Sequence, residues 1–109
     1  MAICADAGQP VHAERTVQQG AVVYLNVVLS AGGFDKDSGQ LQSYARLYAM
    51  PTLMANYCGP SGGWIPVGKS TAWDVRGELI AQALENCAAL VIMDLQDDAC
   101  SGQVICLRK

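Results

Sequence analysis

The sequence AVVYLNVVL at residues 21–29 decides the fold, because it is apolar except for Asn26 and rich in β-branched side chains. Such a run is typical of a strand of a parallel sheet that is covered on both faces. A short apolar run at residues 1–3 precedes it. Residues 11–19, between the two runs, have the pattern of a short helix, with Pro10 at its first turn and Gly20 at its end. We therefore predict a strand–helix–strand unit in which residues 21–29 form the central strand.

The next residues extend this unit to βαβαβ. Residues 30–37 predict a loop at the carboxyl end of the strand, where open α/β sheets usually bind ligands. Asp37 or Ser38 is expected to cap a second helix that continues to residue 49. Its apolar stripe, which we expect to serve packing, consists of Leu41, Tyr44, Ala45 and Tyr48. Residues 52–57 then predict a third parallel strand.

The second half of the chain has a different pattern, with short strand-like runs separated by turn residues. This pattern predicts antiparallel pairing. The runs are residues 64–67, 69–73, 78–83, 88–95 and 103–107, with a turn predicted at 97–102. The predicted fold class is thus α/β, with a βαβαβ unit followed by antiparallel strands.

Composition limits the possible partners. The chain has 109 residues, which is enough for one domain, and a formal net charge of −3. A low charge of this sign indicates neither nucleic-acid binding nor attraction to an anionic membrane. The longest apolar run is far shorter than a bilayer span, and the first residues do not resemble a signal peptide. We therefore expect a soluble, cytoplasmic protein without nucleic-acid or membrane partners.

The five cysteines are scattered and form no CxxC pair, and the chain has one histidine. A zinc site is not expected from this pattern, and we predict no metal site. Most thiols are expected to be free and buried, as is usual in a reducing compartment. A disulfide between Cys100 and Cys106 is the alternative that their proximity in the sequence leaves open.

Cys4 is the first candidate nucleophile. It follows a short strand and precedes a helix, where backbone N–H groups and the helix dipole favour the thiolate. The alternative interpretation is an inert buried cysteine. His12 is the only nearby base that could form a Cys–His dyad with it, although we expect His12 to lie at the surface.

Several short motifs occur in a fixed order along the chain. They are ICAD at residues 3–6, Tyr44-Ala45, Met50-Pro51, Ala55-Asn56 with Gly59, Gly68 with Ser70, and Asp74 followed by GELIA at 77–81. Together they resemble the carbon–nitrogen hydrolase (nitrilase) superfamily, in the C-terminal part that begins at the nucleophilic cysteine. The resemblance covers residues 1–95 of a single partial domain, residues 1–109, and leaves 96–109 as a C-terminal tail.

The resemblance implies a thiol hydrolase site. Cys4 would be the nucleophile, and the backbone N–H of Ala5 would stabilise the oxyanion. Asp6, Asn56, Gly59 and Ser70 would bind substrate or brace the site. This chemistry needs no cofactor, and we expect none.

The family's glutamate base and its lysine precede the cysteine, so neither is carried over. The charged residues that do not match these roles are Glu14, Glu78, Glu85, Lys36 and Lys69. Ala7-Gly8 also replaces the family's usual Arg-Phe.

Three hypotheses follow. The first is a truncated carbon–nitrogen hydrolase-like protein without amide or nitrile turnover, and we favour it. The second is an active thiol amide hydrolase whose base comes from His12 or a partner chain. The third is a small-molecule binding or protein-interaction module.

The resemblance also implies about half of a four-layer α/β/β/α sandwich. Such a half would leave an inner sheet face open, so we expect a homodimer or a higher homo-oligomer. Its copies would pair either sheet to sheet or through the two predicted helices. A small amide or nitrile is the expected ligand.

Overall fold

A computed structural model describes residues 2–3, 9–28, 30, 33–57, 67–85, 89–96 and 99–106. The first part is strand β1 (Ala2–Ile3), helix α1 (Pro10–Gln18), strand β2 (Tyr24–Val28), helix α2 (Phe34–Tyr48) and strand β3 (Thr52–Asn56). β1 pairs with β2 and β2 with β3, both in parallel. The predicted βαβαβ unit is therefore confirmed.

Antiparallel strands follow, as the turn-rich second half predicts. β4 (Thr71–Trp73) pairs with β3, and β5 (Leu79–Gln82) pairs with β4, which gives a five-stranded sheet in the order β1-β2-β3-β4-β5. β6 (Ala89–Gln96) and β7 (Ala99–Cys106) form a separate antiparallel hairpin. Of the strand predicted at residues 64–67, only Val67 is described. The neighbouring Gly68 makes an isolated bridge to Glu85.

The prediction that residues 21–29 form the central strand is wrong. β3 takes that place, because it accepts β2 on one side and β4 on the other. The expectation of burial on both faces is also wrong for the described residues. Side chains of β2 alternate between buried and exposed, and Leu25 and Val27 are 41% and 49% exposed. Helices pack on only one face of this part of the sheet, so an apolar strand keeps an open side.

Helix α2 begins at Phe34, three residues before the predicted cap. Gly33 is its N-cap residue, and Phe34 is buried. Asp35 and Asp37 instead lie in the first turn, where carboxylates favour the positive end of the helix dipole. The helix ends at Tyr48, and its C-cap residue Ala49 adopts a left-handed conformation with φ of 48°.

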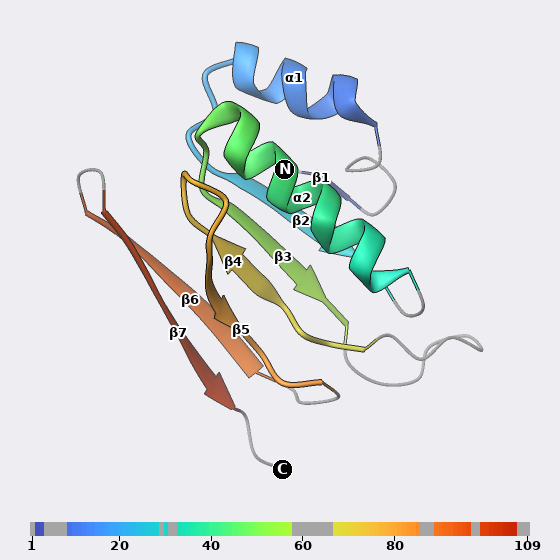
Figure 1. The fold of residues 1–109 in the computed structure, drawn as a ribbon, viewed down its shortest axis with the longest axis vertical. Coiled ribbons are helices and arrows are strands. Elements are labelled where there is room, and N and C mark those ends of the chain that lie inside the picture. The colour runs from blue at the N-terminus through green and yellow to red at the C-terminus, as the bar shows by residue number, and fades with distance from the viewer. Residues whose placement is uncertain are drawn as a thin grey trace.

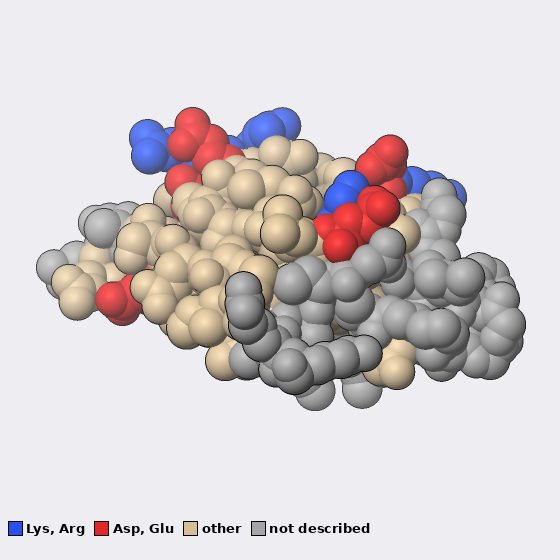
Figure 2. All heavy atoms as spheres, turned by 90° about the horizontal axis from the view of Figure 1, so that it is seen from below, with Lys and Arg blue, Asp and Glu red and all other residues tan. Residues whose placement is uncertain are grey.

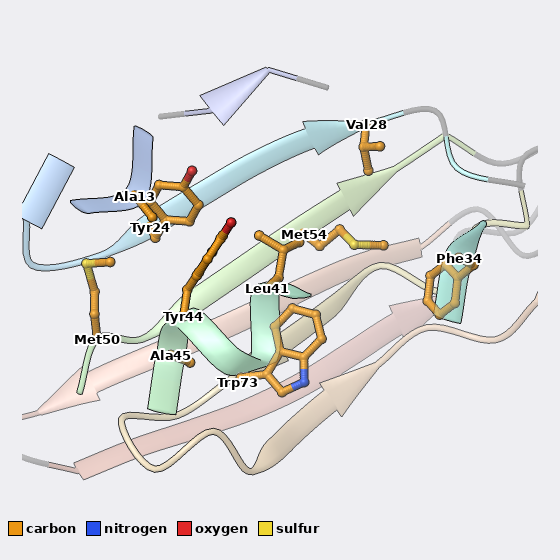
Figure 3. Close-up of a cluster of buried hydrophobic side chains, with 10 residues drawn as sticks. All are labelled: Ala13, Tyr24, Val28, Phe34, Leu41, Tyr44, Ala45, Met50, Met54 and Trp73. Carbon is orange, nitrogen blue, oxygen red and sulfur yellow. The ribbon is translucent and has the colours of Figure 1, made fainter. Parts of the chain in front are cut away.

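The core lies between α1, α2 and the sheet. The predicted stripe of α2 is confirmed, since Leu41, Tyr44 and Ala45 are buried and Tyr48 packs against them. Figure 3 shows Tyr44 and Leu41 pointing from α2 toward the sheet, with Trp73 beside them. The rings of Tyr24 and Tyr44 meet edge to face, with their centroids 5.9 Å apart. Burial raises the pKa of Tyr44, and the hydrogen bond from Gln40 opposes this shift in part.

The predicted turn at residues 97–102 is wrong over 99–102, where β7 has already begun. Cys100 and Cys106 lie on this one strand, and six residues of strand separate them by about 20 Å. A disulfide between these two residues is thereby excluded. No helix among the described residues is long and apolar enough to cross a membrane.

Candidate functional site

The carboxyl ends of the three parallel strands meet at one edge of the sheet (Figure 1). Ile3, the last described residue before Cys4, pairs with Val27, and Asn56 ends β3 beside Val28. This is the edge where open α/β sheets place their ligands. Four of the predicted site residues, Cys4, Ala5, Asp6 and Gly59, lie outside the described residues. Asn56 and Ser70 are described, and both lie at this edge.

Asn56 connects three segments of the chain through its side chain. Its Oδ1 accepts a hydrogen bond from the backbone N–H of Ser30, at 2.7 Å. Its Nδ2 donates to the carbonyl oxygens of Ser30 and Gly68, at 2.9 and 2.8 Å. Both Nδ2 protons are therefore used inside the protein, and the residue is buried. This geometry suits a residue that braces the loops of the site more than one that binds a ligand directly.

Ser70 contacts the backbone of Asn56. Its Oγ accepts a hydrogen bond from the Asn56 N–H at 2.9 Å, and its carbonyl oxygen accepts one from the Ala83 N–H. The chain reaches Ser70 through Gly68 and Lys69, which both have positive φ, 73° and 56°. Two successive left-handed residues form a tight bend that favours glycine at the first position. The structure thus brings Asn56 and Ser70 together through this bend.

Ser30 extends the network to helix α2. Its Oγ donates to Oδ2 of Asp37 at 2.8 Å, and its carbonyl oxygen also accepts from the Val67 N–H. Asp37, predicted as a helix cap, therefore holds the residue that follows β2. The end of β2, the start of α2 and residues 67–70 form one connected polar cluster, which we call the edge network: Ser30, Asp37, Asn56, Gly68 and Ser70.

A lysine and a glutamate lie beside the edge network. Lys69 Nζ is 3.8 Å from a carboxylate oxygen of Glu85 and 5.2 Å from the centroid of the Phe34 ring. The sequence offered no signal for this grouping, because its members come from three distant segments. Both charged side chains are partly exposed, so the pair contributes little to stability.

His12 is half-buried, which corrects the expectation of a surface position. Its Nδ1 lies 2.9 Å from the hydroxyl oxygen of Tyr24, a fully buried residue. Tyr24 is the first residue of β2, whereas β1 pairs with β2 at Asn26 and Val27. The histidine that could serve Cys4 is therefore engaged with the opposite end of β2. The described residues contain no group of three His, Cys, Asp or Glu side chains that could hold a metal ion.

A groove of about 640 Å³ lies elsewhere, at the start of β3. Its walls include Val17, Tyr48 and Pro51, together with Leu95 and Cys100 of the hairpin. None of the edge network lines it. The groove therefore adds no pocket to the predicted site.

No protein-family profile and no curated protein matches the sequence. Solved structures of the nitrilase superfamily do match the fold. Nit3 of Saccharomyces cerevisiae has a TM-score of 0.69 at 22% identity, and the match covers 76% of this chain and 32% of Nit3. A mutant of the Nesterenkonia AN1 amidase has a TM-score of 0.71 at 21% identity, covering 96% of this chain and 36% of the amidase. A carbon–nitrogen hydrolase of Helicobacter pylori G27 has a TM-score of 0.67 at 18% identity, covering 76% of this chain and 35% of the hydrolase.

This chain spans about a third of the length of those proteins. The similarity shows the fold alone, because the identities are below 25%. The expected resemblance is confirmed at that level: over most of its length, the chain has part of the nitrilase-superfamily fold.

Proposed function

We propose that this chain forms the cysteine-bearing part of a carbon–nitrogen hydrolase-like domain, and that its 109 residues alone do not turn over amides or nitriles. In this proposal, Cys4 occupies the nucleophile position and the Ala5 N–H the oxyanion position. One observation carries most of the weight. Ile3, the residue before Cys4, pairs with β2 at the same sheet edge where Asn56 is hydrogen-bonded to Ser70.

The solved relatives support a proposal for the substrate class. In one structure of the Nesterenkonia amidase, the acetamide moiety of fluoroacetamide is covalently added at the active-site cysteine. That adduct keeps its amide intact. Turnover would instead need the thiolate to attack the amide carbon, which forms a sulfur–carbon bond and moves the carbonyl π electron pair onto oxygen, where N–H donors stabilise it until the amine leaves. We therefore propose a small amide or nitrile as the compound that this site would take.

The described charges support the proposed lack of turnover. A thiol nucleophile needs a general base within hydrogen-bond reach. His12 is bound to Tyr24, and Lys69 and Glu85 are bound to each other. These contacts support the proposal that none of the three serves as the base or the oxyanion cation in this chain. A complete site would need groups from outside the described residues.

Asp6 and Gly59 are proposed as ligand-binding or bracing positions, and Asn56 and Ser70 as positioning residues. The bracing role of Asn56 is supported by its three internal hydrogen bonds. In this role, the amide side chain holds the loops that frame the substrate, and it need not touch the reacting atoms.

The test combines thiol labelling with product release. Iodoacetamide labelling near neutral pH, read by mass spectrometry of digested protein, compares Cys4 with the other four thiols. Ammonia release from acetamide and acetonitrile is measured for the wild-type chain and for Cys4→Ser. We expect no ammonia release above that of Cys4→Ser. Release that depends on Cys4, together with much faster labelling of Cys4, would contradict the proposal and establish the active thiol hydrolase instead.

A further inference from the structure

Lys69 has a backbone conformation that is unfavourable for a residue with a side chain. Its φ is 56°, and it directly follows Gly68, whose φ is 73°. Glycine adopts this left-handed region freely, whereas other residues are strained in it. Residues that are held in such strained conformations cluster at active sites and ligand clamps. The conformation of Lys69 therefore points to a role for its side chain at this bend.

The side chain of Lys69 extends from the bend to the start of α2. Its Nζ lies 5.2 Å from the centroid of the Phe34 ring, which is within the range of a cation–π contact. Nζ is also 3.8 Å from Oε1 of Glu85, an ion-pair distance that is too long for a hydrogen bond. Phe34 is buried, whereas the side chains of Lys69 and Glu85 are 34% and 57% exposed. The ring and the carboxylate thus hold the ammonium group at the surface.

The ammonium group of Lys69 still has hydrogen bonds to give. It has three N–H donors, and no described residue accepts a hydrogen bond from Nζ. Glu85 attracts it by charge alone, and an ion pair as exposed as this one is weak. A carboxylate that came within hydrogen-bond distance of Nζ could therefore replace Glu85 at little cost.

This ammonium lies at the edge of the sheet that holds the candidate site. Lys69 stands between Gly68 and Ser70, which both belong to the edge network and contact Asn56 at the end of β3. Phe34, on the other side of the ammonium, is the first residue of α2. Figure 2 looks at the molecule from the lower side of Figure 1, toward which β2 and β3 point, and shows basic side chains beside acidic ones at this surface.

We propose that Lys69 is a specificity residue that binds the carboxylate group of a ligand at this edge. The proposal rests on the position proposed above for Cys4, and it narrows the ligand from small amides to small amides that also carry a carboxylate. The ligand's carboxylate takes the place of Glu85 and accepts the hydrogen bonds that Glu85 does not. The ring of Phe34 keeps the ammonium in place in both states.

Two alkylating reagents that differ in charge provide the test. Iodoacetate carries a carboxylate, and iodoacetamide is its neutral amide. With either reagent, the thiolate sulfur forms a bond to the CH₂ carbon and iodide leaves with the electrons of the broken C–I bond. Mass spectrometry of digested protein gives the alkylation rate of Cys4 for each reagent. The ratio of the iodoacetate rate to the iodoacetamide rate is then compared between variants, because it cancels changes in the thiolate itself.

Lys69→Gln should lower this ratio about five-fold or more, since contact between two unit charges has about that effect even in a medium as polar as water. Lys69→Arg should keep the ratio, because a guanidinium group also binds carboxylates. Glu85→Gln should raise it by removing the competing carboxylate. Lys36→Gln is the matched control, because it removes the same charge from an exposed position in the first turn of α2 and should leave the ratio unchanged.

An unchanged ratio in Lys69→Gln would overturn the proposal. An equal fall in Lys36→Gln would also overturn it, because the effect would then come from net charge. If Cys4 reacts with neither reagent, malonamate should raise the unfolding temperature of the wild type more than neutral malonamide does, and Lys69→Gln should abolish the difference. Equal shifts would then count against Lys69. Failure of the proposed function is seen separately, as ammonia release that depends on Cys4.

Discussion

Two buried asparagines on the helix-facing side of neighbouring strands provide a sharp stability test. Asn26 of β2 is 3% exposed and its Oδ1 has no hydrogen-bond partner, whereas Asn56 of β3 is 8% exposed and makes three side-chain hydrogen bonds. Leucine has nearly the shape of asparagine but neither donates nor accepts. Asn56→Leu removes an amide that makes three hydrogen bonds, and Asn26→Leu removes an amide whose oxygen makes none. The two positions are buried to a similar degree.

The expected cost follows from the groups left without partners. In Asn56→Leu, the buried N–H of Ser30 and the carbonyl of Gly68 lose the amide, while the Ser30 carbonyl keeps the Val67 N–H. Each abandoned buried group costs about 1–3 kcal/mol, so the free energy of unfolding should fall by about 2–6 kcal/mol. Asn26→Leu should change it by less than about 1 kcal/mol, because the substitution removes an oxygen that was already unpaired.

Urea unfolding followed by circular dichroism measures both variants. With an m-value of about 2 kcal/mol per M, a loss of 3 kcal/mol lowers the midpoint by about 1.5 M. An Asn56→Leu chain that is unfolded without urea also agrees with the expectation. Equal midpoints for the two variants would refute the bracing role of Asn56.

Two further predictions concern the hairpin and the core. Gly102→Ala should lower the free energy of unfolding by about 1–3 kcal/mol, because its methyl group would collide with Ala81 and with the backbone of Ile80. Gly39→Ala is its control in urea unfolding. Gly39 lies exposed within α2 with nothing near its added Cβ, so alanine there should raise stability by about 0.5–1 kcal/mol. A Gly102→Ala variant as stable as the wild type would contradict this contact. The raised pKa of Tyr44 makes the protein less stable above pH 10, because the unfolded chain then loses a proton that the folded chain retains. The stability lost between pH 9 and pH 11 should therefore be smaller in Tyr44→Phe than in the wild type. Equal pH dependence in the two proteins would argue against this burial effect.

The sequence predicted the kind and order of the main elements, because their signals are local. The apolar, β-branched run at residues 21–29 marked β2, residues 52–57 after Pro51 marked β3, and the spacing of Leu41, Tyr44 and Ala45 marked α2. It could not predict which faces would be covered, since an apolar strand looks the same whether one layer or two pack on it. Leu25 and Val27 therefore appeared to be core residues and are exposed.

The errors in element bounds have a similar origin. Ser101-Gly102 looks like part of a turn in the sequence, but Gly102 is needed where β7 approaches β5 closely. Asp37 looks like a helix cap, but the buried ring of Phe34 starts the helix earlier. In each case, a contact between distant segments outweighed the local preference.

At the site, the family resemblance named both Asn56 and Ser70, and in the structure the Ser70 Oγ accepts a hydrogen bond from the Asn56 N–H. The partners of Asn56 on Ser30 and Gly68 could not be predicted, because a side-chain hydrogen bond depends on distances that only the assembled sheet sets. The grouping of Lys69, Glu85 and Phe34 was missed for the same reason.

The edge network also has a consequence for motion. Ser30 and Asn56 are far apart in the sequence, so the N–H of Ser30 is protected from solvent only while β2, β3 and the bend at Gly68 are all assembled. Local opening of any one of these segments would expose this single amide. The hydrogen–deuterium exchange rate of this amide therefore reports how often this edge of the sheet opens. A ligand that bound there and held the loops closed would lower this exchange rate without changing the fold.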